Sequence, residues 1–360
     1  MPNDPPPLHG AALGRAAQSN KTNRFEPYTR VAVDDGWLRE DDLPPLRTQV
    51  RDEVPRRVIS RNTSPDLSFD RSVNPYRGCE HGCIYCYARP GHAYLGMSPG
   101  LDFETRLVAR PKAPDLLRHE LSRKSYVPDT LAIGTYTDPY QPIEKERKIM
   151  RGLLQVLAEF HHPVAIITKG VLIERDIDIL APMAAKGLLR VGISVTTLDA
   201  AVSRAMEPRV PAPKRRLQAI ARLSDAGIPV RAMVSPVVPG LTDHEVEAIL
   251  QACADAGAVA ASSIVLRLPR EVAPLFEDWV QAHFPNRAAR IMGRVRDLHG
   301  GKTYDPAFGT RMTGQGEWAA LLRARVKLAT ARLGLDRKLA PLRKDLFAVP
   351  PKAGDQLKLF

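Results

Sequence analysis

Apolar and polar positions alternate in a repeating pattern from about residue 67 to residue 268. Short runs rich in β-branched residues are followed by longer amphipathic stretches, as in strand–helix units around a parallel sheet. We expect six strands, at residues 67–73, 131–136, 164–168, 190–195, 230–234 and 263–268. We expect helices between them, near residues 115–124, 149–160, 174–186, 214–226 and 243–256. The pattern predicts an α/β fold, either a partial (β/α)6 barrel or an open doubly wound sheet, with the chemistry at the carboxyl ends of the strands.

The segments on either side of this region differ from it. Residues 1–60 are rich in proline and show no sustained period, which predicts an irregular arm before a core at residues 61–269. Beyond the core, helical stretches near residues 273–283 and 317–333 predict a basic helical region at residues 270–348. Residues 349–360 contain proline and glycine, and we expect a flexible tail there.

Composition narrows the class of protein. With 360 residues, 44% of them apolar, the chain can fill a real core, which excludes a disordered or fibrous protein. The excess of 52 basic over 40 acidic residues gives a net charge of +12, which favours polyanionic partners without naming one. No apolar run approaches the ~20 residues that span a bilayer, and the first residues lack the pattern of a signal peptide. We therefore expect a cytoplasmic protein with no membrane partner.

Three of the four cysteines fall within eight consecutive residues, at Cys79, Cys83 and Cys86. Four cysteines are too few for a disulfide framework in a chain of this size, so the cluster favours a metal site or catalysis. Cysteine thiolates at short spacings bind iron–sulfur clusters, and three of them leave one iron open. A structural zinc site usually has four ligands, and either His81 or His92 could complete a Cys3His zinc site as the alternative.

The spacing Cys-x3-Cys-x2-Cys, with Tyr85 before the third cysteine, resembles the radical S-adenosylmethionine superfamily. The longer stretch NPYRGCEHGCIYCYAR, with TDPYQPIE after the second strand and TKG after the third, is similar to the branch that contains spore photoproduct lyase and its "DNA repair photolyase" relatives. The resemblance implies a partial (β/α)6 barrel. It also implies a [4Fe-4S] cluster on Cys79, Cys83 and Cys86, S-adenosylmethionine on the open iron, and an electron donor such as flavodoxin or ferredoxin.

The same resemblance implies residues that hold S-adenosylmethionine. Tyr85 would lie near the adenine, and Thr137 would hold the methionyl amino group. Lys169 would pair with the methionyl carboxylate, and Ser194 would contact the nucleoside. Each of the last three also has an ordinary local explanation, because Thr137 could cap a turn, Lys169 could be solvated and Ser194 could satisfy backbone groups.

Polar residues after the second strand are candidates for the catalytic groups. Asp138, Gln141 and Glu144 are closely spaced and could touch substrate, although an Asp-capped turn into the next helix explains them nearly as well. Spore photoproduct lyase returns a hydrogen atom from a cysteine on its second strand, whereas the matching stretch IGTYTD has no thiol. The chain is therefore expected not to be a spore photoproduct lyase in the strict sense, and Tyr136 is the candidate hydrogen relay. Cys253 is expected to be a small buried residue of a helix.

The chain ends in a peptide that resembles the motif by which bacterial repair and replication proteins bind the DNA polymerase sliding clamp. Its matching residues are Gln356, Leu357, Leu359 and Phe360. The apolar side chains could anchor in a pocket while the amide bonds at the rim, or they could pack on their own domain as a closing strand. Basic side chains ahead of this peptide could hold phosphates or could simply cover solvated helix faces; they are Arg323, Arg325, Lys327, Arg332, Arg337, Lys338, Arg343 and Lys344.

These features together predict a radical S-adenosylmethionine enzyme whose target is a nucleobase or sugar in DNA. Three alternatives stay open. The first is a radical enzyme acting on RNA, a protein or a small metabolite. The second is a zinc-structured nucleic-acid binding protein without catalysis, and the third is a clamp-tethered regulator whose cluster senses redox state.

Overall fold

The computed structural model describes residues 14–28 and 46–351. Its main sheet has seven strands in the order β10-β9-β8-β7-β6-β3-β2. The strands are β2 (Ile59–Arg61), β3 (Arg71–Val73), β6 (Leu131–Ile133), β7 (Val164–Thr168), β8 (Leu189–Ser194), β9 (Val230–Val237) and β10 (Ala260–Val265). Neighbours from β3 to β10 pair in parallel, and β2 is antiparallel to β3. The six expected strands are confirmed as one α/β sheet, although β3 starts four residues later than expected and β10 three residues earlier.

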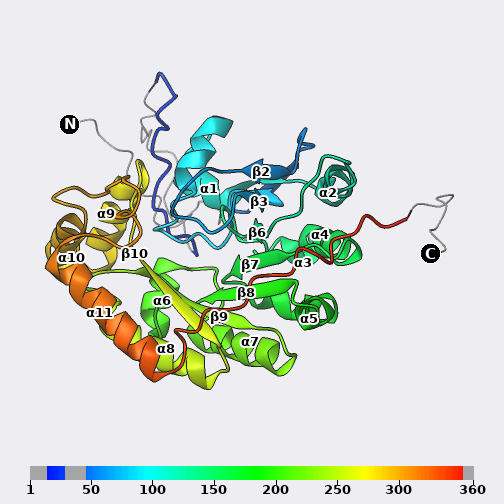
Figure 1. Cartoon of the computed structure of the whole chain (residues 1–360). Coiled ribbons are helices and arrows are strands. Elements are labelled where there is room, and N and C mark those ends of the chain that lie inside the picture. The colour runs from blue at the N-terminus through cyan, green and yellow to red at the C-terminus, as the bar shows by residue number, and fades with distance from the viewer. Residues whose placement is uncertain (1–13, 29–45, 352–360) are drawn as a thin grey trace.

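Helices connect the parallel strands and cover one face of the sheet (Figure 1). They are α2 (Ala113–Leu121), α4 (Ile149–Glu159), α5 (Ile177–Ala185), α7 (Pro213–Asp225) and α8 (Val246–Asp255), which match the expected positions. Shorter helices are α1 (Leu101–Thr105), α3 (Glu144–Arg147) and α6 (Ala200–Met206). Among the described residues no helix is both long enough and apolar enough to cross a membrane.

Side chains of each strand alternate between two faces. On β8, Leu189, Val191 and Ile193 belong to the main apolar core that packs against the helices. Gly192 and Ser194 lie on the opposite side, which we call the inner face. The parallel register places Ile167 of β7 beside Gly192 and Met233 of β9 beside Ser194 on that same face.

A second, small sheet lies outside this pattern and was not predicted. It has the order β1-β5-β4, with β1 (Gln49–Asp52) parallel to β5 (Arg106–Ala109) and β4 (Tyr76–Arg77) antiparallel to β5. Residues 49–52 and 59–61, expected to be part of an irregular arm, therefore form strands β1 and β2. These strands are short, and most of their side chains are exposed, so no apolar alternation marks them in the sequence.

The C-terminal region contains three helices, α9 (Val272–His283), α10 (Pro285–Leu298) and α11 (Gly316–Arg332). The first and third match the expected positions, and α10 was not predicted. Buried side chains of α9 and α10 share one apolar cluster with Cys83, Ile84 and Tyr85. These helices therefore pack directly against the segment that carries the cysteines.

Residues 333–351 contain no helix, although residues 333–348 fall in the region expected to be helical. Gly334, with φ +66°, follows the end of α11, and Pro341 and Pro350 disfavour a new helix. This segment, which we call the strap, crosses the amino-terminal edge of the main sheet (Figure 1). The Leu335 carbonyl accepts from Ala261 N at 2.9 Å, and Ala348 N donates to the Phe160 carbonyl at 3.1 Å.

The loop between α10 and α11 joins the two edges of the main sheet. Val265 at the end of β10 donates its amide to the Met312 carbonyl at 3.1 Å. The adjacent Arg311 pairs with Asp66 at 2.6 Å and donates to the Ser64 hydroxyl at 2.6 Å, and both partners follow β2. The loop thus spans the open side of the curved sheet.

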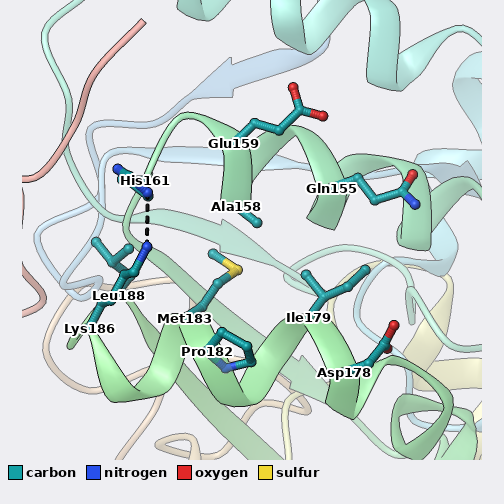
Figure 2. A pocket seen from close by; sticks show the side chains of 10 residues that line it. All are labelled: Gln155, Ala158, Glu159, His161, Asp178, Ile179, Pro182, Met183, Lys186 and Leu188. Atoms are coloured by element: carbon teal, nitrogen blue, oxygen red, sulfur yellow. Dashed lines mark hydrogen bonds between the residues drawn. The ribbon is translucent and has the colours of Figure 1, made fainter. Parts of the chain in front are cut away.

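Figure 2 shows a hollow of about 320 Å³ between α4 and α5, on the helical layer. Ala158, Ile179 and Met183 contribute apolar surface, and His161 and Lys186 meet at 3.0 Å beside it. The hollow lies on the helix side of the sheet and is separate from the carboxyl ends of the strands.

Candidate active site

The three clustered cysteines lie on a loop that directly follows β4, residues 78–88, which we call the cysteine loop. Gly78 and Gly82 adopt positive φ values of +75° and +65°. A Cβ on Gly78 would lie 2.9 Å from the Phe103 carbonyl, and one on Gly82 would lie 2.6 Å from the Glu104 carboxylate. Only glycine fits both positions, and the loop can turn tightly around the thiols for that reason.

A buried ion pair holds this loop in place. Arg89 is fully buried and pairs with Glu104 at 2.6 Å. The same guanidinium donates to the carbonyls of Gly82 and Cys83, at 2.9 and 3.0 Å. The Glu104 carboxylate also accepts from the amide of Ala17 at 3.0 Å, which brings the N-terminal segment against the loop. The loop's backbone carbonyls therefore face a fixed positive charge.

The three thiols share one buried environment. Cys79 and Cys83 are buried, and Cys86 is half-buried. Burial raises the pKa of Cys83 to about 12, and the pKa of Cys79 is raised well above its usual value by burial and by Asp138, Cys83 and Cys86. Thiolates so disfavoured in the free protein need a cationic partner, and an iron–sulfur cluster supplies one. The donor set fits a cluster held by three cysteines with one iron open.

Of the two histidines that could complete a zinc site, His92 is hydrogen-bonded to the protein, whereas His81 Nδ1 lies near a carboxylate without a hydrogen bond to it. His81 Nδ1 lies 3.3 Å from the Asp138 carboxylate, and His92 Nε2 lies 2.9 Å from the Arg106 carbonyl. Burial lowers the pKa of His92 to about 4. Within residues 14–28 and 46–351, no group of three or more His, Cys, Asp or Glu side chains is arranged to hold a single metal ion. The hydrogen bond to the Arg106 carbonyl makes His92 the weaker of the two candidates for a Cys3His zinc site.

Lys169 follows β7 and lies against the cysteine loop. Its ammonium is 5.6 Å from the centre of the Tyr85 ring. Burial by itself lowers the pKa of Lys169, but Cys83, Glu207 and Asp138 raise it above the ordinary value. The side chain is therefore a stable cation beside the thiols, suited to an anionic group such as a carboxylate.

Tyr85 and Ser194 are linked by a buried network. The Tyr85 hydroxyl donates to Glu207, whose carboxylate also accepts from Thr196 at 3.0 Å. Glu207 pairs with Arg216 at 2.9 Å, and Arg216 donates to the Ser194 carbonyl at 3.0 Å. Burial alone would raise the pKa of Glu207, but Arg216 and Lys169 lower it below the usual value. Glu207 is therefore an anion that ties the cysteine loop to the end of β8.

Thr137 and Asp138 lie where β6 leads into the site. The Thr137 hydroxyl donates to the Tyr76 carbonyl at 2.9 Å. Asp138 accepts from the Lys169 amide at 2.8 Å and from the Thr168 hydroxyl at 2.5 Å. Burial would raise the pKa of Asp138, but His81 and these hydrogen bonds lower it to about 2. Asp138 thus holds the start of the Lys169 segment next to the cysteine loop.

A match to a protein-family model shows the family to which this chain belongs. The model described as "Radical SAM superfamily" matches residues 73–253, half of the chain. The chain belongs to the radical SAM superfamily. An uncharacterized protein of Mycobacterium tuberculosis (strain H37Rv) is 35% identical over 291 residues, 80% of this chain and 82% of that protein. An uncharacterized protein of Methanocaldococcus jannaschii is 27% identical over 173 residues, 48% of this chain and 62% of that protein.

Solved structures of spore photoproduct lyase share this fold. The lyase complexed with dinucleoside spore photoproduct superposes with a TM-score of 0.57 at 14% identity, over 79% of each chain. A double mutant of the lyase with bound AdoMet and dinucleoside spore photoproduct gives a TM-score of 0.55 at 16% identity, again over 79% of each chain. This likeness confirms the radical SAM fold, and the superfamily implies S-adenosylmethionine and an iron–sulfur cluster as cofactors.

The structure brings the expected cofactor residues of this radical SAM enzyme to one end of the sheet. Tyr85, Thr137, Lys169 and Ser194 all follow or end strands at their carboxyl ends, next to the cysteine loop. Glu144 is different. Its buried carboxylate accepts from the Tyr76 hydroxyl at 2.5 Å and from the Met150 amide at 3.0 Å, and it pairs with Arg175 at 2.8 Å. The Glu144 carboxylate is therefore already bound by other groups of the protein.

Gln141 and Tyr136 also face the cysteine loop. The Gln141 side chain accepts from the Glu80 amide at 2.9 Å and donates to the Gly78 carbonyl at 3.3 Å, so it orders the loop. Tyr136 packs beside Cys79 and Phe103, and burial raises the pKa of its hydroxyl to about 12. The hydroxyl therefore stays protonated near the thiols.

Several residues that order the candidate site were not singled out by the sequence analysis. Arg89 and Glu104 carry no motif that pairs them, and Arg216 lies on a helix where a solvated arginine is the ordinary expectation. Tyr87 directly follows Cys86, and that position was the available signal. Its hydroxyl donates to the Thr135 carbonyl, and Arg267 stacks on its ring at 4.6 Å.

Proposed function

We propose that this radical SAM enzyme cleaves S-adenosylmethionine reductively and directs the radical at a nucleobase or sugar of DNA. Cys79, Cys83 and Cys86 would hold a [4Fe-4S] cluster, which would supply the one-electron reduction that splits S-adenosylmethionine into methionine and a 5′-deoxyadenosyl radical for hydrogen abstraction. The electron comes from a donor such as flavodoxin or ferredoxin. The RNA, protein and small-metabolite targets are the alternatives that the experiments below separate.

Each residue of the site has a defined task in this proposal. Lys169 pairs with the methionyl carboxylate, and Asp138 fixes its backbone through the 2.8 Å amide bond. Thr137 holds the methionyl amino group as an acceptor, since its own proton is directed to the Tyr76 carbonyl. Tyr85 and Ser194 bound the nucleoside. Tyr136, packed beside Cys79, is the group proposed to return a hydrogen atom.

The observation that carries the choice of a nucleic acid is a set of five exposed aromatic side chains, most of them beside arginines, which we call the aromatic rim. In the described part of the chain, the exposed aromatic residues are Phe25, Tyr28, Tyr87, Tyr94 and Phe308. Three arginines stack on four of these rings. Arg24 lies 4.6 and 4.9 Å from Phe25 and Tyr94, and Arg267 and Arg311 each lie 4.6 Å from Tyr87 and Phe308 respectively.

Two members of the aromatic rim, Tyr87 and Tyr94, are next to the cysteines in the chain. Tyr87 is on the cysteine loop, and Tyr94 is on the 3-10 helix Arg89–Leu95 that follows it. Phe25 packs on Tyr94 with ring centroids 5.2 Å apart, and Phe308 is on the loop that meets the end of β10. Exposed rings can stack unpaired bases, which a small apolar metabolite does not require. Of the three arginines, Arg24 and Arg311 also pair with the carboxylates of Glu271 and Asp66. The net charge of +12 supports the same class of partner.

The clamp-binding peptide at Gln356, Leu357, Leu359 and Phe360 lies outside the described residues. The proposal that it binds a bacterial sliding clamp rests on its sequence alone. It is compatible with a DNA target, because a clamp would bring the enzyme to newly copied DNA.

The deciding experiment uses anaerobically reconstituted protein. We expect brown protein that converts S-adenosylmethionine to 5′-deoxyadenosine once reduced, with deuterium transferred from labelled DNA. Colourless protein containing one zinc would instead support a binding module, and brown protein that makes no 5′-deoxyadenosine would support a redox sensor. Transfer from RNA, protein or metabolites but not from DNA would redirect the substrate assignment.

Variants test the aromatic rim separately from the cofactor. Phe25→Ala and Tyr94→Ala are expected to weaken binding of single-stranded DNA about tenfold each, since stacking contributes ~1–3 kcal/mol per base. Leu321→Ala, an exposed apolar residue on α11, is the control. Equal DNA affinity in all three variants would remove the rim from the binding surface.

A further inference from the structure

We propose that Arg190 and Arg231 form an oxyanion subsite on the inner face of the sheet, which receives a phosphate or carboxylate group of the substrate. This inference rests on the proposed function, because it assumes that the substrate reaches the same face as S-adenosylmethionine. It adds that the substrate carries an anionic group, which the cofactor site alone does not require.

Strand register places both arginines on the inner face. Arg190 is four residues before Ser194 on β8, so the two side chains point to the same side. Arg231 of β9 is the register partner of Gly192, which also lies on that side. The outer neighbours of both arginines, Val191 and Ala232, belong to the apolar core against the helices.

Neither arginine has an acidic partner among the described residues. Arg190 donates to the carbonyls of Leu339 and Ala340 in the strap, and Arg231 donates to the Ala261 carbonyl at 3.0 Å. Other arginines of the chain with little exposed side chain are paired: Arg71 with Asp70, Arg89 with Glu104, Arg110 with Glu53 and Arg216 with Glu207. In the described part of the chain, Arg190 and Arg231 are thus neighbouring cations that only carbonyl oxygens meet, whereas Arg15, which also has no acidic hydrogen-bond partner, donates to the Thr48 hydroxyl as well.

This arrangement has an energetic cost that an anion would remove. Burial lowers the pKa of Arg231, and burial together with the charge of Arg231 lowers the pKa of Arg190. Two desolvated like charges disfavour the folded state, whereas an oxyanion between them accepts hydrogen bonds from two guanidinium groups. Among the described residues, only Nη1 of Arg231 has a hydrogen-bond partner, so its other nitrogens are left as donors for an anion.

The position suits a substrate that is held at one end and reacts at the other. At ~3.3 Å per residue, the level of Arg231 is about 7 Å, and that of Arg190 about 13 Å, from Ser194 along the strands. A group bound there is close to the amino-terminal edge of the sheet, where the strap crosses. The reacting part of the same molecule would extend toward the cysteine loop.

The test measures anion binding directly, on the full-length holoenzyme with its cluster and saturating S-adenosylmethionine, so that Lys169 is already occupied. Equilibrium dialysis with radiolabelled inorganic phosphate should show one site, and Arg231→Met should weaken it at least tenfold. Arg231→Lys, which keeps the charge but loses the planar fork, should give an intermediate affinity. Arg294→Met on α10, an exposed arginine, is the matched control and should bind phosphate as the wild type does.

Thermal unfolding separates this role from a structural one. In chloride buffer without phosphate, Arg231→Met should have an unchanged or higher Tm, because it removes an uncompensated charge. Phosphate should raise the Tm of the wild type by about 2 °C and leave that of the variant unmoved. A lower Tm for Arg231→Met in chloride, with wild-type phosphate binding, would show that Arg231 only supports β10 and would overturn the proposal. Absence of phosphate binding by the wild type would also overturn it.

A competition arm distinguishes the two sources of oxyanion. Displacement of phosphate by acetate at constant ionic strength would support a general oxyanion subsite, and resistance to acetate would support a phosphate subsite. The result is independent of the DNA assignment. If labelled DNA transfers no deuterium while Arg231-dependent phosphate binding persists, the proposed function fails and the subsite stands.

Discussion

The carboxylate of Glu207 and the guanidinium of Arg216 lie 2.9 Å apart, and neither side chain is exposed to solvent. Glu207 also accepts from the Tyr85 hydroxyl, and Arg216 also donates to the Ser194 carbonyl. The pair therefore connects two candidate cofactor residues that come from distant parts of the chain. It does so without itself being a candidate to touch the cofactor.

Replacing one partner of this pair is expected to be more damaging than replacing both. Glu207→Gln leaves a buried guanidinium without its counter-charge and should lower the free energy of unfolding by about 3–5 kcal/mol. The double variant Glu207→Leu with Arg216→Met should recover part of that loss. Denaturant unfolding of the three proteins gives the comparison, and a fully additive double variant would show that the two residues are not coupled.

Lys169→Met should weaken binding of S-adenosylmethionine by about 10- to 100-fold, because a charge-assisted bond contributes ~1.5–3 kcal/mol. Iron content should not change, since Lys169 is not a ligand. Lys186→Met on the far, helical side of the sheet removes the same charge and should bind the cofactor normally. Wild-type affinity in Lys169→Met would exclude the carboxylate contact.

Gly91→Ala should disturb Tyr136 specifically. A Cβ at position 91 would overlap the Tyr136 hydroxyl, so the ring must move away from its place beside Cys79. We expect a loss of about 1–3 kcal/mol of stability from this overpacking. Adding Tyr136→Phe removes the atom nearest to the new methyl group and should restore part of the stability. No rescue by Tyr136→Phe would mean that the two positions do not meet.

His162 should make the stability of the protein fall in mild acid. Burial lowers its pKa to about 4, and its Nε2 lies 2.7 Å from the Tyr126 hydroxyl in the aromatic group that Phe347 of the strap completes. The unfolded chain takes up a proton at this histidine below about pH 6.5, whereas the folded chain does not until about pH 4. The stability it confers is thus complete above pH 6.5 and is lost as the pH falls toward 4, by at most ~3 kcal/mol.

The check is the pH dependence of unfolding in His162→Gln. Its slope between pH 6.5 and pH 4 should be smaller than that of the wild type, because one of the buried neutral histidines is gone. His92, with a pKa of about 4 for the same reason, should account for part of the remaining slope. Identical slopes in both proteins would show that His162 does not titrate on unfolding.

Deleting residues 356–360 should abolish binding to a bacterial sliding clamp while 5′-deoxyadenosine formation continues at the wild-type rate. The reason is that the peptide's apolar residues are the proposed anchors and lie outside the cofactor site. Surface plasmon resonance against immobilised clamp measures the first quantity. Clamp binding that survives the deletion would place the interaction elsewhere or remove it.

Sequence reasoning found the parts of the fold that have a local signature. Strand β7 has the bounds expected for it, because its run of apolar β-branched residues is buried on the helix side and flanked by turns. Strand β1 could not be found in this way, since its four residues are largely exposed and its partner β5 lies 57 residues further along the chain. Helix α10 was missed although its buried residues recur at helical spacing, from Ala288 to Leu298.

The residues of the candidate site also divide into those with a local sequence signature and those without one. The cysteines and the polar residues at strand ends were found because their spacing and their place after strands are local properties. The partners that hold them were not, because Arg89 and Glu104 or Glu207 and Arg216 meet only when the sheet has folded. The sequence around a charged residue does not indicate whether its side chain will be solvated or will pair with a buried counter-charge.

The strap crosses the amino-terminal edge of the sheet, and the described chain leaves it at Pro351, a few residues beyond the Ala348 contact with Phe160. The cysteine loop lies at the other end of the sheet, next to Lys169 and Glu207. A partner that binds the residues after Pro351 would therefore attach to the protein from the side of the amino-terminal edge of the sheet. The cysteine loop would stay accessible to a substrate while that partner is bound.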